Sequence, residues 1–161
     1  MAKTPAHCAF CDLIRGAAEV SVCYEDAAAL AFMDIQPVND GHVLVVPKEH
    51  YATVREVPRE LGVHLYAVTM ELLPVIQRVT GCEDVNIIVS SGSAAGQDVF
   101  HYHVHLIPRR AGDGFDVPLP FAGSEMPSRE HLEATAARII AAMRDPMRDP
   151  LRDRGGETRV A

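Results

Sequence analysis

Three histidines stand at alternate positions in the segment FHYHVH, namely His101, His103 and His105. Successive side chains of a β-strand point to opposite faces, so the three rings are predicted to share one face at spacings of roughly 6.5–7 Å. Imidazole exchanges protons near neutral pH and also binds metal ions. The pattern therefore favours metal binding, or acid–base and nucleophilic chemistry on an anion, over a merely polar strand surface.

The segment just before the histidines, SSGSAAGQDV, is rich in small residues and contains Gly92 and Gly96. Glycines permit tight turns in which backbone N–H groups converge on an anion. Taken alone, the segment is more typical of an ordinary flexible connection. Beside the histidines, it indicates a loop that holds a phosphate while an imidazole attacks it. Zinc held by all three histidines, with one coordination position open, is the alternative.

A second group of reactive side chains lies in the segment CAFC, where Cys8 and Cys11 have the spacing of a zinc knuckle. A redox pair of this kind would begin a helix after a strand of a βαβ unit, and the N-terminal sequence shows no such pattern. Two packed thiols are the simpler alternative. Cys23 and Cys82 have no partner signal and are expected to be core or surface thiols.

The strands that must position these residues are predicted from short apolar or alternating runs bounded by turn residues. They are expected over residues 21–25, 28–34, 42–47, 84–91 and 101–108. The third run is apolar throughout, which is typical of a strand buried on both faces.

Two helices are predicted from apolar residues at helical spacing. The first runs from Pro58 to Val79, with Gly81 where a C-cap belongs and with Pro74 predicting a kink or an early break. The second is expected to begin at Ser128 as its N-cap. The residues that it is expected to bury are Leu132, Ala136, Ile139, Ile140 and Met143.

The order of the elements predicts an α+β domain, with an antiparallel sheet of about five strands and two helices packed on one face. Residues 1–143 are expected to form this domain. Residues 144–161 repeat Arg-Asp-Pro and are expected to be an irregular or disordered tail, because the prolines prevent a long helix.

Composition excludes several classes of protein. The 161 residues are 48% hydrophobic, without an apolar run long enough to span a bilayer and without a signal-peptide core, so a cytoplasmic protein is expected. The net charge of -7 disfavours broad nucleic-acid binding, although a local anion pocket fits it. Reduced cysteines are expected in that compartment.

The segment GQDVFHYHVHLIPR resembles the signature of the histidine triad (HIT) family, in which three histidines alternate with hydrophobic residues. CAFCDLIRG, LAFMDIQPVNDGHVLVVPKEH and the glycine loop follow in family order, so the resemblance covers about residues 8–115. It implies a HIT-like fold and a nucleotide hydrolase or transferase that acts at the α-phosphate. The implied substrates are phosphoramidates, dinucleoside polyphosphates or adenylylated metabolites, with a purine nucleotide or its derivative as the expected ligand.

The resemblance also implies roles for single residues. His103 would attack phosphorus and form a covalent nucleotidyl-histidine, and His105 would contact the phosphate and the scissile oxygens. A histidine at the third position fits the hydrolase branches of the family. Asp34 would accept hydrogen bonds from ribose hydroxyls. Four loop residues would hold phosphate oxygens, namely Gly96, Gln97, Asp98 and Val99.

Ser90 stands where many relatives carry asparagine or glutamine in contact with the nucleotide, and a shorter hydroxyl can still bond through water. The family likeness further implies a closed, structural zinc site made by Cys8, Cys11, His50 and His101. It implies a homodimer as well. A zinc-dependent hydrolase with the metal on the triad, and a nucleotide-binding adaptor with little catalysis, are the alternative functions.

Overall fold

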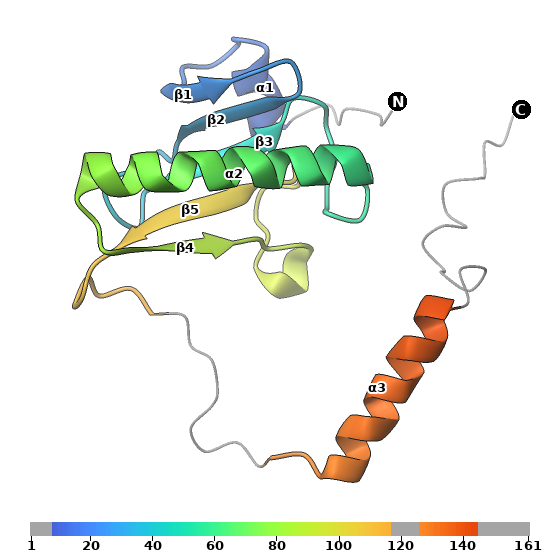
Figure 1. Cartoon of the computed structure of the whole chain (residues 1–161). Helices are drawn as coiled ribbons and strands as arrows, with labels where there is room; N and C mark the ends of the chain where they lie inside the picture. The colour runs from blue at the N-terminus through green and yellow to red at the C-terminus, as the bar shows by residue number, and fades with distance from the viewer. Residues whose placement is uncertain (1–7, 117–125, 145–161) are drawn as a thin grey trace, which may run out of the picture. The chain divides into compact units, whose positions relative to one another are not determined.

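The computed structural model describes residues 8–116 and 126–144, which fall in two units that are treated separately. The first unit, shown in Figure 1, contains a five-stranded sheet. Its elements in chain order are α1 (Ala9–Ile14), β1 (Val22–Glu25), β2 (Ala29–Met33), β3 (Val43–Pro47), α2 (Arg59–Thr80), β4 (Asp84–Ile88), the 3-10 turn η1 (Ser93–Ala95) and β5 (Val104–Arg109). Of the described helices, none is long and apolar enough to cross a membrane.

The strand order is β1-β2-β3-β5-β4, and every neighbouring pair is antiparallel. The predicted antiparallel α+β fold is therefore confirmed. The number of helices was wrong, because α1 was not predicted. It is only six residues long and covers the CAFC segment, too short for helical periodicity to be visible in the sequence.

The side chains of β2 and β3 alternate between two apolar clusters. Ala29, Ala31, Val43 and Val45 belong to the cluster that contains the inner face of α2. The intervening residues of both strands join Phe10, Cys8 and Cys11 of the N-terminal segment in a second cluster. Because alternate residues face opposite sides of a sheet, α2 and α1 lie on opposite faces. The two helices predicted to cover one face were α2 and α3 (Arg129–Arg144), and α3 belongs to the other unit, so that arrangement stays a prediction.

Helix α2 ends as predicted but does not break at Pro74. Gly81 has φ +66° and donates its N–H to the Gln77 carbonyl over 2.9 Å, which is the expected left-handed C-cap. Pro74 lies on the exposed side, where the carbonyl that loses its partner meets water. Leu72 and Ile76 are buried on either side of it, and their contacts with the sheet hold the helix together.

The second unit contains α3 (Arg129–Arg144), and the predicted N-cap is confirmed, since Ser128 Oγ accepts a hydrogen bond from the His131 N–H over 3.1 Å. The predicted burial of its apolar face was wrong. All five residues expected inside are exposed, namely Leu132, Ala136, Ile139, Ile140 and Met143. The described part of this unit holds no second element for that face to pack against. Beyond Arg144, the predicted tail lies outside the described residues.

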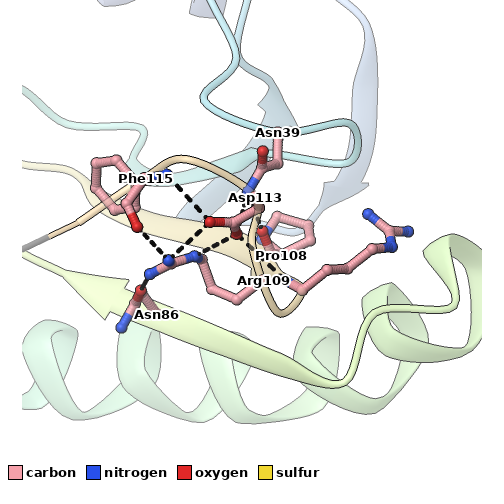
Figure 2. A network of polar contacts seen from close by, with 7 residues as sticks. Asn39, Asn86, Pro108, Arg109, Asp113 and Phe115 are labelled. Carbon is pink, nitrogen blue, oxygen red and sulfur yellow. Dashed lines mark hydrogen bonds and ion pairs between the residues drawn. The ribbon is translucent and has the colours of Figure 1, made fainter.

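A polar network closes the far end of β5 (Figure 2). The Arg109 guanidinium donates to both carboxylate oxygens of Asp113, over 2.6 and 2.9 Å, and also bonds Asn86 of β4. Asn39, from the β2–β3 loop, donates to Asp113 over 2.9 Å and to the Pro108 carbonyl over 2.8 Å. Hydrogen bonds from Arg109 hold the pKa of Asp113 well below its ordinary value. The network ties the β2–β3 loop and the segment after β5 to the end of the sheet.

Gly41 allows the β2–β3 loop to approach the end of α2. Its φ is +87°, and an added Cβ would lie 2.3 Å from Thr80 Cγ2. Gly41→Ala is expected to lower the free energy of unfolding by about 1–3 kcal/mol, from left-handed strain together with the clash. Chemical denaturation measures this change.

Thr80→Ser is the matched variant, because it removes Cγ2 and keeps the hydroxyl that donates to the Ile76 carbonyl. The double variant Gly41→Ala/Thr80→Ser should regain the free energy of unfolding that the clash costs. It should not regain the part that the left-handed backbone at residue 41 costs. Full stability in Gly41→Ala alone would contradict the close approach.

Candidate functional site

The three histidines are not all on one strand. β5 begins at Val104, so His101 and His103 precede it and only His105 lies within it. The backbone N–H of Tyr102 instead bonds the Tyr51 carbonyl over 2.6 Å, which takes this stretch away from β3. The bounds of the predicted strand were wrong, yet its alternation persists, since Tyr102 and Val104 pack in the cluster under α2 while the histidines do not.

His101 is fully buried and connects two parts of the chain. Its Nε2–H donates to the Pro47 carbonyl over 2.8 Å, which directs Nδ1 toward the cysteines. Nδ1 lies 3.5 Å from Sγ of both Cys8 and Cys11, and His50 Nδ1 lies 3.4 Å from Sγ of Cys11. Burial lowers the pKa of His101 to about 4, so its ring is neutral, the form that ligates metals.

These distances match a tetrahedral zinc site. Zinc bonds of about 2.3 Å to sulfur and about 2.0–2.1 Å to nitrogen place the two ligand atoms about 3.5 Å apart. All four donor atoms of Cys8, Cys11, His50 and His101 lie within 4.8 Å of one another. The donor set therefore fits zinc in composition and in spacing. Burial, and next the neighbouring Cys8, raise the pKa of Cys11 to about 11, so metal binding must release a proton there.

The hydrogen bonds of His103 fix its tautomer. Its Nδ1 lies 2.7 Å from the His101 carbonyl, which can only accept, so Nδ1 carries the hydrogen. Nε2 is then left with a free lone pair. The edge of the Phe10 ring packs against this imidazole at a centroid distance of 5.3 Å, and the ring is buried. In the neutral ring, the geometry therefore presents Nε2 as an oriented nitrogen with a free lone pair.

His105 is oriented by His42, a residue that the sequence motifs do not single out. The Val38 N–H donates to His42 Nδ1 over 3.2 Å, so the hydrogen of His42 is on Nε2. That nitrogen lies 3.0 Å from His105 Nδ1 and donates to it. His105 consequently carries its own hydrogen on Nε2. His42 directly precedes β3, and Leu44 of β3 pairs with His105. This position beside the strand was the signal that could have indicated the role of His42.

Electrostatics agree with these tautomers. Burial, and next the nearby His103 and His42, lower the pKa of His105 to about 4. Burial also lowers the pKa of His42, against the opposing effect of Asp34, whose Oδ2 lies 3.5 Å from His42 Nδ1. Both rings are therefore neutral near pH 7 in the free protein.

An open cleft lies in front of His103 and His105. Its apolar wall includes Phe10, Phe32 and Leu44, from α1, β2 and β3. His103 borders the cleft. So do five other residues that were predicted to bind substrate, namely Asp34, Gly96, Asp98, Val99 and His105. Asp34 also accepts a hydrogen bond from the Gln36 N–H over 2.8 Å, which fixes the turn after β2.

Gln97 and Ser90 are not among the residues that border the cleft. The Gln97 side chain is buried and is used to shape the loop. Its Oε1 accepts from the Gly92 N–H over 2.7 Å, and its Nε2 donates to the carbonyls of Ala52 and Val99 over 2.7 and 3.0 Å. The geometry therefore fits support of the loop better than a side-chain contact with phosphate.

The backbone of the loop offers a narrower set of donors than predicted. The N–H groups of Gly96 and Gln97 donate to carbonyls inside the loop, over 3.0 and 3.2 Å. Those of Asp98 and Val99 have no hydrogen-bond partner within residues 8–116 and 126–144. Two adjacent free amides at the edge of the cleft can bind an anion.

Comparison with known proteins identifies the family. A HIT domain family model matches residues 15–112, more than half of the chain. The Arabidopsis thaliana protein adenylylsulfatase HINT3 is 38% identical over 106 residues, which are 66% of this chain and 54% of that protein. The chain thus spans about half of that relative. The Schizosaccharomyces pombe adenosine 5′-monophosphoramidase hnt1 is 37% identical over 105 residues, which are 63% of this chain and 74% of that protein.

Solved structures agree. Protein SMU.412c of Streptococcus mutans matches with a TM-score of 0.82 and 35% identity over 89% of each chain. A zinc-bound histidine triad protein of Mycobacterium smegmatis matches with a TM-score of 0.63 and 33% identity, over 84% of this chain and 96% of the other. The fold and the histidine cluster are those of an α+β histidine triad domain. The chain belongs to the HIT family, as its sequence motifs predict.

The candidate metal site predicts a strong effect of zinc on stability. At free zinc one thousand times Kd, binding to the folded state adds about 4 kcal/mol to the free energy of unfolding. Cys11→Ser is expected to abolish stoichiometric zinc, measured by mass spectrometry of the metal content, and to remove this stabilisation. Cys23→Ser changes an exposed thiol outside the cluster and should keep both. Full zinc content in Cys11→Ser would contradict the assignment.

Proposed function

We propose that the protein hydrolyses nucleotide derivatives at the α-phosphate through a covalent nucleotidyl-histidine on His103. The observation that carries the proposal is the 2.7 Å bond from His103 Nδ1–H to the His101 carbonyl, which leaves Nε2 free beside the cleft. Nucleophilic catalysis by histidine requires this protonation state. The names of the plant and yeast relatives, an adenylylsulfatase and a monophosphoramidase, support the reaction class.

In the first step, His103 Nε2 forms a bond to the α-phosphorus and the bond from phosphorus to the leaving group breaks. The leaving atom takes the electron pair of the broken bond and the Nε2 proton of His105. A bound phosphate anion favours the imidazolium form of His105, against the pKa-lowering effect of burial. The added proton lies on Nδ1, in place of the hydrogen bond from His42, so the ring is neutral once Nε2 has given up its proton.

In the second step, water attacks the same phosphorus and the bond to His103 Nε2 breaks, which returns the ring with its electron pair. His105 accepts the proton that the attacking water loses. The Asp98 and Val99 N–H groups hold phosphate oxygens through both steps, so the developing charge meets donors that are already oriented. Asp34 binds the ribose hydroxyls, and the apolar wall of Phe10, Phe32 and Leu44 takes the base, with a purine as the expected one.

Zinc has a structural role in this proposal. When bound by Cys8, Cys11, His50 and His101, it would join the N-terminal segment to the backbone that holds His103. A metal on all three triad histidines fits the geometry less well. His101 Nδ1 faces the thiols, and the hydrogen of His103 Nδ1 is used by a carbonyl.

His103→Ala is expected to lower turnover by about 10⁴-fold or more, as removal of a nucleophile does in other hydrolases. The variant should still bind nucleotide and zinc, since His103 is not in the cysteine cluster. Release of AMP from an adenosine phosphoramidate measures the effect, and mass spectrometry of wild-type protein quenched during turnover should show the nucleotidyl adduct on His103.

His64→Asn provides a control, because His64 pairs with Asp26 outside the cleft and the variant should turn over normally. A fully active His103→Ala would exclude the mechanism. Tight nucleotide binding by the wild-type protein without turnover of any substrate would favour the adaptor instead.

We also propose that the protein is a homodimer in which α2 and the edge strand β4 form the contact. Val63, Tyr66 and Met70 form a stripe on α2, each more than half exposed. Tyr66→Glu is expected to shift the mass measured by light scattering from twice 17.5 kDa toward the single chain. Val54→Glu, at an exposed loop position, should remain dimeric. A wild-type monomer would overturn the proposal.

A further inference from the structure

The charges around the cleft are unusual for a site that binds a phosphate. Four acidic residues border it, namely Asp12, Glu19, Asp34 and Asp98, and no lysine or arginine of the described residues does so. Of the histidines at its end, His105 does not offset these charges in the free protein, since burial keeps its pKa near 4. The cleft therefore carries net negative charge near pH 7.

The four carboxylates do not contribute equally at the reacting phosphate. Asp12 is paired with Arg15, and Asp34 accepts a backbone hydrogen bond and lies beside His42. Glu19 belongs to the segment before β1. Asp98 stands in the loop whose amides face the cleft, and within the described residues its carboxylate has no ion pair or hydrogen bond.

The position of Asp98 links its charge to the leaving group. If its backbone N–H holds a phosphate oxygen, the carboxylate of the same residue lies within about 8 Å of the phosphorus, by covalent reach alone. His103 attacks from the sheet side, so an in-line displacement sends the leaving group toward the open side of the phosphorus. A unit charge there would interact with Asp98 through a partly solvated path.

We propose that Asp98 selects the leaving group, so that the site prefers nucleoside phosphoramidates whose leaving amine is cationic over those whose leaving group is anionic. This inference rests on the proposed function and narrows its substrate class. Sulfate, carboxylate-bearing and polyphosphate leaving groups add negative charge to a cleft that no lysine or arginine of the described residues borders. A leaving amine with a pendant ammonium group instead brings a positive charge beside Asp98, and Asp98 stabilises that charge.

The step balances with the groups already described. His103 Nε2 forms the bond to phosphorus, and the phosphorus–nitrogen bond breaks with its electron pair going to nitrogen. That nitrogen takes one proton from His105 and leaves as a neutral amine. Asp98 gives and takes no proton, and it acts only through its charge.

Three AMP phosphoramidates of matched size test the inference, with 2-aminoethyl, propyl and 2-carboxyethyl groups on the leaving nitrogen. These leaving groups are cationic, neutral and anionic. Wild-type protein is expected to give kcat/KM values in that order, measured as AMP release. In Asp98→Asn the ratio of the cationic to the anionic substrate should fall by about tenfold, as expected for loss of a unit charge at this range. Raising the salt concentration should reduce the wild-type ratio in the same direction.

Glu60→Gln is the matched control, because it removes the same charge at an exposed position in the first turn of α2, outside the cleft. It should keep the wild-type ratio. An unchanged ratio in Asp98→Asn, with all three substrates hydrolysed, would overturn the selection by Asp98 and leave the hydrolase intact.

A binding measurement distinguishes failure of the proposed hydrolase function from failure of the charge selection by Asp98. Affinity for AMP, ADP and ATP is expected to fall with each added phosphate in wild-type protein and to fall less steeply in Asp98→Asn. If no phosphoramidate is hydrolysed, the proposed function fails whatever this series shows. If the affinities rise with added phosphate, or fall equally in both proteins, the charge selection fails.

Discussion

The buried imidazole of His101 is the point on which the candidate site depends. Its Nε2 is held by the Pro47 carbonyl at the end of β3, and its Nδ1 faces the thiols of Cys8 and Cys11. Its backbone carbonyl orients His103. A buried polar group must satisfy all of its hydrogen bonds to be tolerated, so these contacts constrain one another. The position of the N-terminal segment and the tautomer of His103 are therefore set by one residue.

The alternation of side chains explains why so much was predictable. The strands are short and strongly patterned, and β2 and β3 bury both faces, which made their apolar runs visible. The family resemblance, carried by the cysteine spacing and the histidines, implied a metal cluster whose residues the structure brings within ligand distance, although His50 and Cys8 are far apart in the chain. Residue type and spacing alone did not single out His50 and left two packed thiols as an alternative.

The remaining features depend on contacts that a linear pattern does not contain. His42 could not be assigned because its effect comes from the Val38 N–H, which fixes its tautomer and through it that of His105. Gln97 was expected to face a ligand, yet the fold of the glycine loop directs its amide inward. The apolar stripe of α3 was expected to be buried, but periodicity identifies an amphipathic helix without identifying its partner.

The electrostatics of the cleft bear on the choice between a hydrolase and a nucleotide-binding adaptor. Tight binding of a phosphate without turnover is commonly achieved with lysine or arginine, and none of the described residues around the cleft supplies one. Two backbone amides and His105 bind the ground-state phosphate less tightly than such a side chain would. They interact more strongly with charge that develops during reaction, because oriented dipoles require no rearrangement. A cleft of this composition stabilises a transition state better than it stores a nucleotide, and this favours the hydrolase.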